Sequence, residues 1–478
     1  MPPSKVLFVA AEAYPLVKTG GLGDVAGALP PVLRDLGIDV RLLLPAYRDV
    51  LAKLDHFSEG PRLGEVLPGV MARLLAARMP GSDVPLVMVD CPDLFDRPGS
   101  PYQSEEGTDW PDNHLRFALL SRVAVLLGLA GNLNGWQPDL VHVNDWHSAL
   151  VPLQLKVWGP ARPKTVLTIH NIGYQGLFPP GVAESVGIAP DQFHIGAAEF
   201  WGRISFLKAG ITSADCITTV SPTYAQSITQ SGEGGGLEGV IAGRGDRVVG
   251  IVNGIDSDVW NPATDSMIYQ TYDVKNLSAK RLNTPDLRQE LGLPRDSSRP
   301  LAVIVSRFVE QKGIDVVLAA VPGLLRAGVD LAVLGTGDRV LERAFSAVAN
   351  SYPDRVAVSV GYDEALAHRM IAGGDMLLVP SRFEPCGLTQ LYGQRYGTLP
   401  VVHRVGGLAD TVRDYQDGFA FDDLSPRSLT VAVDRAVRAF RDELSWRHLQ
   451  IQAMTKDLGW NVCARQYYDL YHTLIEKR

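Results

Sequence analysis

The sequence predicts an α/β protein with two doubly wound, Rossmann-like domains facing a central cleft. Two observations predict this fold class. Short apolar runs alternate with helical patterns from one end of the chain to the other, and similar glycine-rich loops follow apolar runs in both halves. Such alternation is typical of parallel sheets with crossover helices. Open sheets of this kind bind ligands outside the carboxyl ends of their strands.

Each half of the chain has its own series of expected strands. In the first half they are Val6–Ala10, Val40–Leu44, Leu86–Val89, Leu140–Val143, Val166–Ile169, Cys216–Val220 and Val248–Val252. In the second half they are Leu301–Val305, Leu331–Leu334, Val356–Val360, Met376–Val379 and Leu399–Val402.

A chain of 478 residues is too long for one ordinary core. The turn-rich segment at residues 253–262 is the expected hinge, because domain boundaries fall in exposed turns. We therefore expect one domain at residues 1–250 and a second at 251–459. The amphipathic pattern at residues 460–478 could finish the second domain or cross back onto the first.

The glycine-rich stretch at residues 18–25, Lys-Thr-Gly-Gly-Leu-Gly-Asp-Val, follows the first expected strand. Apolar residues then recur at helical spacing, as at Leu22, Val25 and Leu29, so the loop opens a helix. The N–H groups at a helix start have no intrahelical partner and suit a phosphate. With the charge of Lys18 added, the loop predicts an anionic ligand.

Residues 404–412, Arg-Val-Gly-Gly-Leu-Ala-Asp-Thr-Val, repeat this pattern after another apolar run. A glycine-rich turn alone has an ordinary structural explanation, because Gly is the usual residue of turns. The repetition favours two similar domains.

The composition predicts a soluble globular protein, with 46% hydrophobic and 21% charged residues. A net charge of −8 argues against nucleic acid or an anionic membrane as partner. No run reaches the roughly 18 apolar residues that span a bilayer, and residues 1–4 lack a leader pattern, so we expect a cytoplasmic protein. The four scattered cysteines, and the spacing of His142, His147 and His170, give no reason to expect a metal or a disulfide framework.

Two cations follow the strand expected at Leu301–Val305. Arg307 and Lys312 would lie at its carboxyl end, with Gly313 near the start of the next helix. A nucleoside diphosphate that departs as a leaving group needs such a pair to meet its negative charge. The alternative is that both are solvated surface residues.

The loop at residues 380–390 offers complementary chemistry. Glu384 precedes a helix that begins near Gly387 and Thr389, where it could receive sugar hydroxyls or oppose developing positive charge. It could also cap the helix or pair with Arg382. Its loop position favours a functional role.

Polar residues also end strands in the first half of the chain. Asp145 and His170 each follow an expected strand, as Glu12 follows the first. Either residue alone would more simply be a hydrogen-bonding loop residue. Their convergence with Lys18 on one sheet edge favours a site.

Four stretches, at residues 18–25, 306–313, 380–390 and 406–411, resemble the signature stretches of bacterial glycogen synthases and plant starch synthases. They occur in the family's order, and the match runs from the first strand to about Tyr471. The resemblance implies a GT-B architecture whose helix at 460–478 returns to the first domain. It also implies transfer of glucose from ADP-glucose to the non-reducing end of glycogen or another α-1,4-glucan, with retention and without a metal ion or cofactor.

The resemblance also implies the site residues. The expected catalytic residues, which hold the diphosphate or orient the sugar and acceptor, are Glu384, Arg307, Lys312, His170 and Asp145. The expected substrate-binding residues are Lys18, Gly20, Gly21, Glu12, Asn171, Tyr362, Cys386, Gly387, Leu388 and Thr389. Tyr362 would lie by the adenine, and the role of Asp363 stays open because some relatives carry His there.

Two other classes of protein are alternatives. A nicotinamide oxidoreductase would use the G-x-G-x-x-A pattern at residues 21–26. About ten residues separate Ala10 from Gly21, however, and Leu44-Pro45-Ala46 stands where an acidic ribose-binding residue should end the second strand. A glucan-binding protein without catalysis would bind sugar but not turn it over. The complete set of basic and carboxylate motif residues argues against it.

Overall fold

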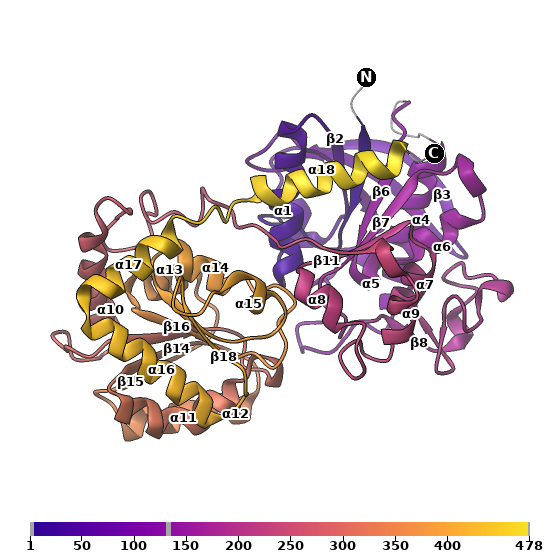
Figure 1. Ribbon diagram of the computed structural model, residues 1–478. Helices are drawn as coiled ribbons and strands as arrows, with labels where there is room; N and C mark the ends of the chain where they lie inside the picture. Colours follow the sequence, from indigo (N-terminus) through magenta and orange to yellow (C-terminus); the bar gives the residue numbers. More distant parts are fainter. Residues whose placement is uncertain (1–3, 131–134, 477–478) are drawn as a thin grey trace. The chain divides into compact units, whose positions relative to one another are not determined.

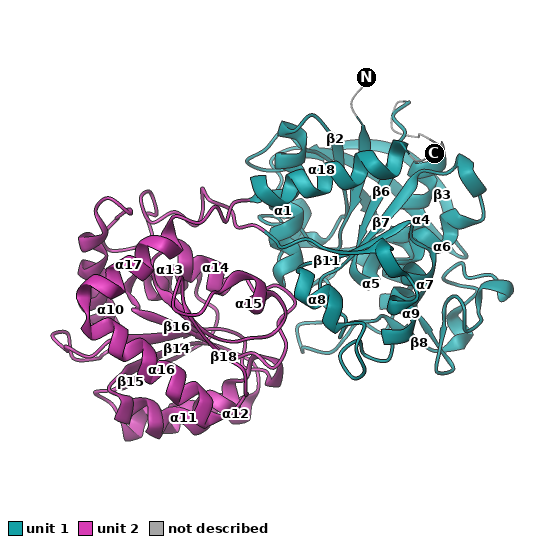
Figure 2. Ribbon diagram, viewed as in Figure 1, with its two compact units in different colours: residues 1–253, 460–478 teal, residues 254–459 magenta. Residues whose placement is uncertain are grey.

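The computed structural model describes residues 4–130 and 135–476. The chain divides into two compact units, which are coloured separately in Figure 2. Unit 1 comprises Met1–Asn253 with Trp460–Arg478, and unit 2 comprises Gly254–Gly459. The ends of the expected first domain and of its returning helix, residues 1–3 and 477–478, lie outside the described residues. No described helix is long and apolar enough to cross a membrane.

The main sheet of unit 1 contains nine strands among the described residues, in the order β12-β11-β7-β6-β1-β2-β5-β4-β3. Its strands are β1 (Lys5–Val9), β2 (Asp39–Pro45), β3 (Ser58–Leu67), β4 (Val70–Arg78), β5 (Pro85–Asp90), β6 (Leu140–Asn144), β7 (Lys164–Ile169), β11 (Cys216–Thr219) and β12 (Val248–Gly250). A small separate sheet holds β8 (Leu177–Phe178), β9 (Glu199–Phe200) and β10 (Arg203–Ser205).

The helices of unit 1 connect these strands (Figure 1). They are α1 (Gly21–Asp35), α2 (Arg48–Ala52), α3 (Pro92–Phe95), α4 (Asn113–Ala130), α5 (Asp145–Ser148), α6 (Leu150–Lys156), α7 (Phe206–Ser213), α8 (Pro222–Ser227), α9 (Glu238–Ala242) and α18 (Trp460–Glu476). Helix α1 buries Leu22, Val25 and Leu29, the positions that its periodicity predicts to face the core.

The C-terminal helix α18 packs against α1 within unit 1. The Tyr471 hydroxyl lies 2.5 Å from Nδ1 of buried His142 on β6, and the other ring nitrogen lies 2.6 Å from Oγ1 of Thr168 on β7. A hydrogen-bonded chain thus joins α18 to the two strands that carry the candidate site residues of this unit.

Unit 2 has a parallel sheet of six described strands in the order β15-β14-β13-β16-β17-β18. They are β13 (Leu301–Val305), β14 (Asp330–Gly335), β15 (Val356–Val360), β16 (Met376–Val379), β17 (Leu399–His403) and β18 (Phe419–Phe421). Its helices are α10 (Asn283–Glu290), α11 (Ile314–Ala327), α12 (Arg339–Ser351), α13 (Glu364–Gly373), α14 (Thr389–Arg395), α15 (Gly406–Thr411), α16 (Pro426–Arg441) and α17 (Glu443–Met454). Figure 1 shows α11, α12 and α16 on one face of this sheet and α10, α13 and α14 on the other.

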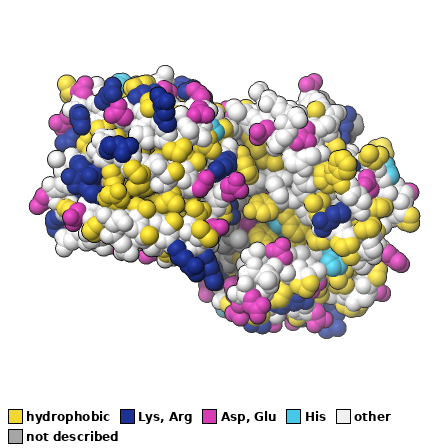
Figure 3. Space-filling view, turned by 90° about the horizontal axis from the view of Figure 1, so that it is seen from below, with side chains coloured by type: hydrophobic (Ala, Val, Ile, Leu, Met, Phe, Trp, Pro, Cys, Tyr) yellow, Lys and Arg dark blue, Asp and Glu magenta, His cyan; other side chains and the backbone are white. Residues whose placement is uncertain are grey.

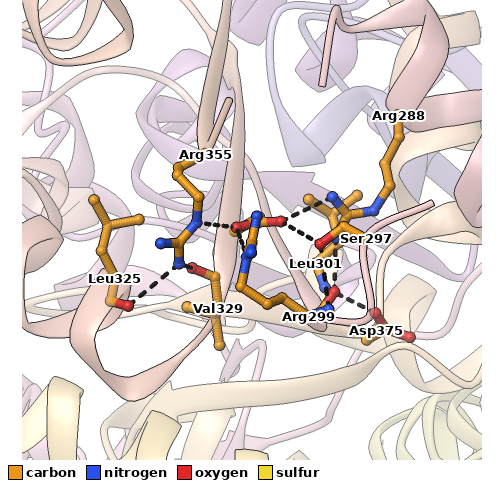
Figure 4. A network of polar contacts seen from close by, with 9 residues as sticks. Arg288, Ser297, Arg299, Leu301, Leu325, Val329, Arg355 and Asp375 are labelled. Atoms are coloured by element: carbon orange, nitrogen blue, oxygen red, sulfur yellow. Dashed lines mark hydrogen bonds and ion pairs between the residues drawn. The ribbon is translucent and has the colours of Figure 1, made fainter. Parts of the chain in front are cut away.

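The amino end of the unit 2 sheet is closed by a charge network (Figure 4). The buried carboxylate of Asp330 accepts hydrogen bonds from Arg288 at 2.9 Å, from Arg299 at 2.8 Å, and from Arg355. Burial raises the pKa of Asp330, but the hydrogen bonds from the three arginines outweigh burial and hold this pKa below its usual value. The network fixes the end of the sheet opposite the candidate site.

The prediction of parallel sheets is wrong at one edge of unit 1. Strands β3 and β4 form an antiparallel hairpin, and β4 also pairs antiparallel with β5. Most β3 residues are not buried, so the strand lacks the continuous apolar run on which the predictions depended. The short strands β8, β9, β10 and β18 were missed because runs of two or three residues give no periodic signal.

Candidate active site

Lys312 and Glu384 meet at the carboxyl edge of the unit 2 sheet. Lys312 Nζ lies 2.5 Å from Glu384 Oε2, and Ser381 Oγ donates to the same oxygen at 2.8 Å. Glu384 is 6% exposed. All three residues line a pocket that also includes Gly387 and Thr389. Two residues predicted to act on the same substrate are thus brought into direct contact.

The loops that carry this pair are held together by a glycine and an arginine. Gly313 has φ +65°, and a Cβ placed on it would lie 1.9 Å from the Pro380 carbonyl oxygen. The Arg382 backbone N–H donates to the Gln311 carbonyl at 2.8 Å, and its guanidinium binds both Asp315 carboxylate oxygens at 2.7 Å. The alternative pairing of Arg382 with Glu384 is therefore wrong. Arg382 instead fixes the separation of the two loops.

The Arg307 guanidinium is exposed and has no hydrogen-bond or ion-pair partner among the described residues. Its neighbour Phe308 is fully buried and anchors the loop. Arg307 and Lys312 follow the same strand, β13, and because β13 and β16 are adjacent, Arg307 lies on the same sheet edge as the Glu384 loop. A free cation there is available to an anion.

Sequence reasoning missed the loop at residues 335–338, Gly-Thr-Gly-Asp, which follows β14. The Phe308 N–H donates to the Thr336 carbonyl at 2.8 Å, and the Asp338 N–H donates to the Phe308 carbonyl at 2.7 Å. A Cβ on Gly335 would lie 1.9 Å from the Ser306 carbonyl oxygen. This loop supports the backbone at Arg307, and its glycines after an expected strand were the signal that could have revealed it.

The start of α14 is shaped by Gly387 and Gln390. Gly387 has φ +73°, and an added Cβ would lie 2.3 Å from Gln390 Oε1. Gln390 Nε2 donates to the carbonyls of Cys386, at 3.0 Å, and Gly387, at 2.8 Å. Among the described residues, the pocket lining includes Gly387 and Thr389 but not Leu388 or Cys386, whose side chain is buried.

Tyr362 stands apart from this pocket. It follows β15 at the far edge of the sheet and is 77% exposed. Its hydroxyl lies 3.4 Å from Glu364 Oε2. The Asp363 carboxylate accepts from the Leu366 N–H at 2.8 Å and caps α13. Asp363 thus has a structural role as a helix cap.

In unit 1, Glu12 organises the first glycine-rich loop. It is buried, and its Oε2 accepts from the N–H groups of Thr19 and, at 3.1 Å, Gly20, while the Tyr102 hydroxyl donates to Oε1 at 2.7 Å. Burial raises the pKa of Glu12 in spite of these bonds. The Glu12 carboxylate and the Gly20 N–H thus bond to each other, and the assignment of both residues to substrate binding stays a prediction.

Lys18 also has a partner within its own loop. Its Nζ lies 2.7 Å from Asp24 Oδ1 in the first turn of α1. Gly21 opens that helix, whose start has no side-chain cap. A Cβ added to Gly20 would find no described atom within 4 Å, so open space lies beside the loop. An anion there would have to draw Lys18 away from Asp24.

Asp145 and His170 come together at the ends of β6 and β7. Asp145 has φ +51°, and its Oδ1 accepts from the backbone N–H of His170 at 2.7 Å and of Asn171 at 3.4 Å. Burial raises the pKa of Asp145 to about 7, although these bonds oppose the rise. The Asn171 side chain accepts from the Gly173 N–H at 3.0 Å, which closes the following turn.

The protonation of His170 follows from its neighbour Asn144. Asn144 Nδ2 donates to the Val9 carbonyl at 3.0 Å, so its Oδ1 faces His170 Nε2, 2.9 Å away. Because an amide oxygen only accepts, Nε2 carries the proton and Nδ1 keeps its lone pair. Burial lowers the pKa of His170 to about 3, so the ring is neutral near pH 7. His170 Nδ1 is therefore a hydrogen-bond acceptor.

Two aromatic residues beside Glu12 were not predicted. Tyr102 stacks on the His147 ring with centroids 4.7 Å apart, and Phe117 packs edge-on against His147 at 4.7 Å. No described strand directly precedes Tyr102, so no strand-end pattern in the sequence marks it as a site residue. Within the described parts of the chain, no group of three potential ligands is arranged to hold a metal ion. On the face seen in Figure 3, acidic and basic side chains are interspersed.

The two Rossmann-like units, with cations and carboxylates at the carboxyl edges of their sheets, define a GT-B glycosyltransferase. The family model for the starch synthase catalytic domain matches residues 5–243, and that for group 1 glycosyl transferases matches residues 286–444. The chain belongs to the glycogen synthase and starch synthase family. This membership excludes the nicotinamide oxidoreductase alternative.

Individual relatives agree with this assignment. A glycogen synthase from Rhodospirillum rubrum is 48% identical and one from Paramagnetospirillum magneticum is 47% identical, over 98% of this chain and 98% and 97% of theirs. The catalytic domain of starch synthase IV from Arabidopsis thaliana, bound to ADP and acarbose, has a TM-score of 0.87 and 31% identity, and the match covers 99% of this chain and 100% of that one. A sucrose-phosphate synthase from Thermosynechococcus elongatus, at 18% identity and TM-score 0.60 over 99% and 100% of the two chains, shares the fold.

Proposed function

We propose that this protein is a glycogen synthase that transfers glucose from ADP-glucose to the non-reducing end of an α-1,4-glucan, with retention and release of ADP. The observation that carries the proposal is the pocket in unit 2 where Lys312 contacts Glu384, on the same sheet edge as Arg307, whose side chain has no partner in the described part of the chain. The relatives support the reaction class, since they are glycogen synthases and a starch synthase with bound ADP.

The residues of unit 2 suit the departure of a diphosphate. As the bond between the glucose carbon and the phosphate oxygen breaks, negative charge grows on the diphosphate and positive charge grows on the sugar. Arg307 and Lys312 stabilise the first charge, and Glu384 receives the sugar hydroxyls and opposes the second. Gly387 and Thr389 line the pocket beside the sugar. Gly387, Leu388 and Thr389 offer backbone and hydroxyl donors at the start of α14, and Cys386 is a further substrate-binding residue of this loop. Tyr362 packs beside the adenine.

The residues of unit 1 are assigned to the sugar and the acceptor. Neutral His170 accepts a hydrogen bond from a glucose hydroxyl through Nδ1, and Asp145 and Asn171 hold its loop in place. Lys18 and the Gly20-Gly21 backbone meet the nucleotide sugar, beside the open space at Gly20, while Glu12 holds that loop in shape.

The test is to offer ADP-glucose and UDP-glucose separately, with and without a glucan primer, and to measure the released nucleoside diphosphate. The proposal predicts ADP release that requires the primer, with incorporation of glucose into the glucan. Faster release from UDP-glucose would contradict the donor assignment. Release that does not depend on primer would mark a hydrolase and contradict the transfer.

A further inference from the structure

An exposed tryptophan occupies an unusual turn in unit 1. The hairpin of β9 and β10 is closed by Trp201 and Gly202, which both have positive φ, 51° and 75°. Two-residue turns with this geometry favour Asn-Gly, because a bulky side chain at positive φ is strained. Trp201 is nevertheless 84% exposed. Its indole contributes little to the core, so packing does not explain why it is there.

The surroundings of the hairpin fix Trp201 in this strained conformation. The Gly202 N–H donates to Glu199 Oε1 at 2.7 Å, and Ser205 and Ile204 of β10 pair with β8. The rings of Phe200 and Trp201 meet edge-to-face with centroids 6.3 Å apart. A strained residue persists only where the surrounding structure holds it in place, and such residues cluster at functional sites.

The backbone at Gly235 and Gly236, which we call the glycine strip, carries no side chains and lies beside the Trp201 indole. A Cβ on Gly236 would lie 3.0 Å from the Phe200 ring and 3.8 Å from Trp201 Nε1, and one on Gly235 would lie 2.7 Å from Gln175 Nε2. Both glycines also have positive φ, so the strip does not accommodate side chains. Gln175 is 9% exposed, and its Oε1 has no hydrogen-bond partner among the described residues. Tyr174, beside Gln175 in the chain, is 54% exposed.

This surface is continuous with the loop that carries His170. The Tyr174 N–H donates to the Asn171 carbonyl at 3.2 Å, and a Cβ on Gly176 would lie 2.4 Å from the Trp146 ring, next to Asp145. The Phe206 N–H after β10 donates to the Gly176 carbonyl at 3.1 Å. A chain bound on the surface would therefore lie beside the candidate site of the same unit.

We propose that Trp201, Tyr174 and the glycine strip at residues 235–236 form an aromatic platform that binds the α-glucan acceptor away from its reacting end. The inference rests on the proposed function, which makes a neutral polysaccharide the substrate. A pyranose ring offers apolar C–H faces that stack on aromatic rings and hydroxyls that bond to backbone groups, and the platform supplies both kinds of partner. An exposed indole beside glycine backbone, without a contiguous apolar core, fits a sugar chain better than a protein partner.

The decisive variant is Trp201→Asn, because Asn suits positive φ and should leave the turn as stable as before or more so. The measured quantities are the ratio of kcat/KM for glycogen to that for maltotriose, and retention of the protein in glycogen-containing native gels. A long glucan reaches both platform and reacting site, whereas maltotriose is too short to gain from both. We expect the ratio to fall about tenfold, the loss typical of removing one anchoring tryptophan, and gel retention to fall with it. Trp201→Phe should recover part of each loss.

The matched control is Trp158→Ala, since Trp158 is 57% exposed on the same unit but lies outside the platform. Trp158→Ala should leave the kcat/KM ratio and the retention in glycogen-containing gels unchanged. Unaltered values for Trp201→Asn, or equal losses in the control, would overturn the platform. A loss of self-association on sedimentation with glucan retention intact would assign the surface to a second copy and overturn it too. Because gel retention needs no turnover, failure of the platform is distinguishable from failure of the proposed transferase activity.

Discussion

The two glycine-rich loops, at residues 18–25 and 404–412, have similar sequences and opposite surroundings. A Cβ on Gly20 would meet no described atom within 4 Å. A Cβ on Gly406 would lie 2.1 Å from the Glu384 carbonyl oxygen, and one on Gly407 would lie 2.3 Å from the Cys386 carbonyl oxygen. The first loop borders open space, whereas the second is filled by its own chain. The same motif therefore indicates room for a ligand in one unit and close backbone packing in the other.

The second loop has a supporting role. The Gly407 N–H donates to the Glu384 carbonyl at 2.9 Å, so α15 holds the backbone that presents Glu384 to Lys312. Glycine is required at positions 406 and 407 because any Cβ there would overlap the neighbouring carbonyl oxygens. The following experiments test whether the two loops differ in this way, from the largest expected effect to the smallest.

Lys312→Ala tests the contact between Lys312 and Glu384, which the second glycine-rich loop supports. We expect kcat to fall about 10²–10³-fold, because a cation is lost from the developing diphosphate charge. Glu384, nearly buried, is left without its partner, so unfolding free energy should also fall by about 1–3 kcal/mol. Arg307→Ala should lower kcat without this loss of stability. In the described chain Arg307 has no hydrogen-bond or ion-pair partner that the substitution would leave unpaired.

Kinetics and thermal unfolding of both variants are the measurements, with exposed Lys275→Ala as the control. Glycogen elongation by Lys312→Ala at the parent's rate would mean that the pocket does not hold the diphosphate.

Gly407→Ala and Gly20→Ala compare the loops directly. The new methyl group in Gly407→Ala must displace the backbone at Cys386, and a misplacement of about 1 Å near the reacting groups costs about a hundredfold in rate. Gly20 has extended backbone with φ −151° and no described atom beside it, so alanine there should leave the fold intact and change kcat by less than about threefold, while its methyl group enters the space proposed for the donor and should raise KM for ADP-glucose. Steady-state kinetics of Gly407→Ala and Gly20→Ala measure the two losses of kcat. Equal damage from both would remove the distinction between open and filled loops.

The pH dependence of stability should also distinguish the units. Unit 1 buries Asp145 without a cation, and its pKa is raised to about 7, whereas unit 2 pairs Glu384 with Lys312. A raised carboxyl pKa contributes stability that is fully present below the unfolded value near 3.8 and is lost as pH rises through about 7. Asp145→Asn removes this dependence and keeps an oxygen to accept the His170 N–H.

The variant should therefore gain stability relative to the parent as pH rises from 4.5 to 8, by roughly 3 kcal/mol. Urea unfolding of both proteins at several pH values measures the difference. A constant difference across this range would show that Asp145 is ionised throughout.

Lys18 and Arg404 are the matching cations of the two loops. Lys18 borders the open space, and Lys18→Ala should raise KM for ADP-glucose about tenfold, the effect of one charge-assisted hydrogen bond. Arg404 pairs with exposed Asp422 at 2.9 Å, and Arg404→Ala should change the same constant by less than about twofold, because surface pairs contribute little. Initial-rate kinetics with varied donor test both variants. A larger rise in KM for Arg404→Ala than for Lys18→Ala would show that the second loop, and not the first, meets the donor.

Central strands and motif positions could be predicted from sequence, whereas long-range partners could not. The bounds of Leu301–Val305, Val356–Val360 and Met376–Val379 agree with prediction because these apolar runs stand out from the helical patterns around them. Lys312 and Glu384 were predicted from separate motifs and are in contact. The partner of Glu12, Tyr102, lies 90 positions away, and that of Arg382, Asp315, lies 67 positions away. Local periodicity carries no information about such pairings.

The central claim is that the unit 2 pocket at Lys312 receives the diphosphate, with the second glycine-rich loop as its support. A crystal structure of the protein with bound ADP tests it most directly. The account predicts phosphate oxygens within about 3 Å of Lys312 Nζ and of the Arg307 guanidinium, with α15 still packed against the backbone of Glu384. A diphosphate that contacts neither cation, or one that lies on Gly406 and Gly407 in place of the Glu384 loop, would contradict it.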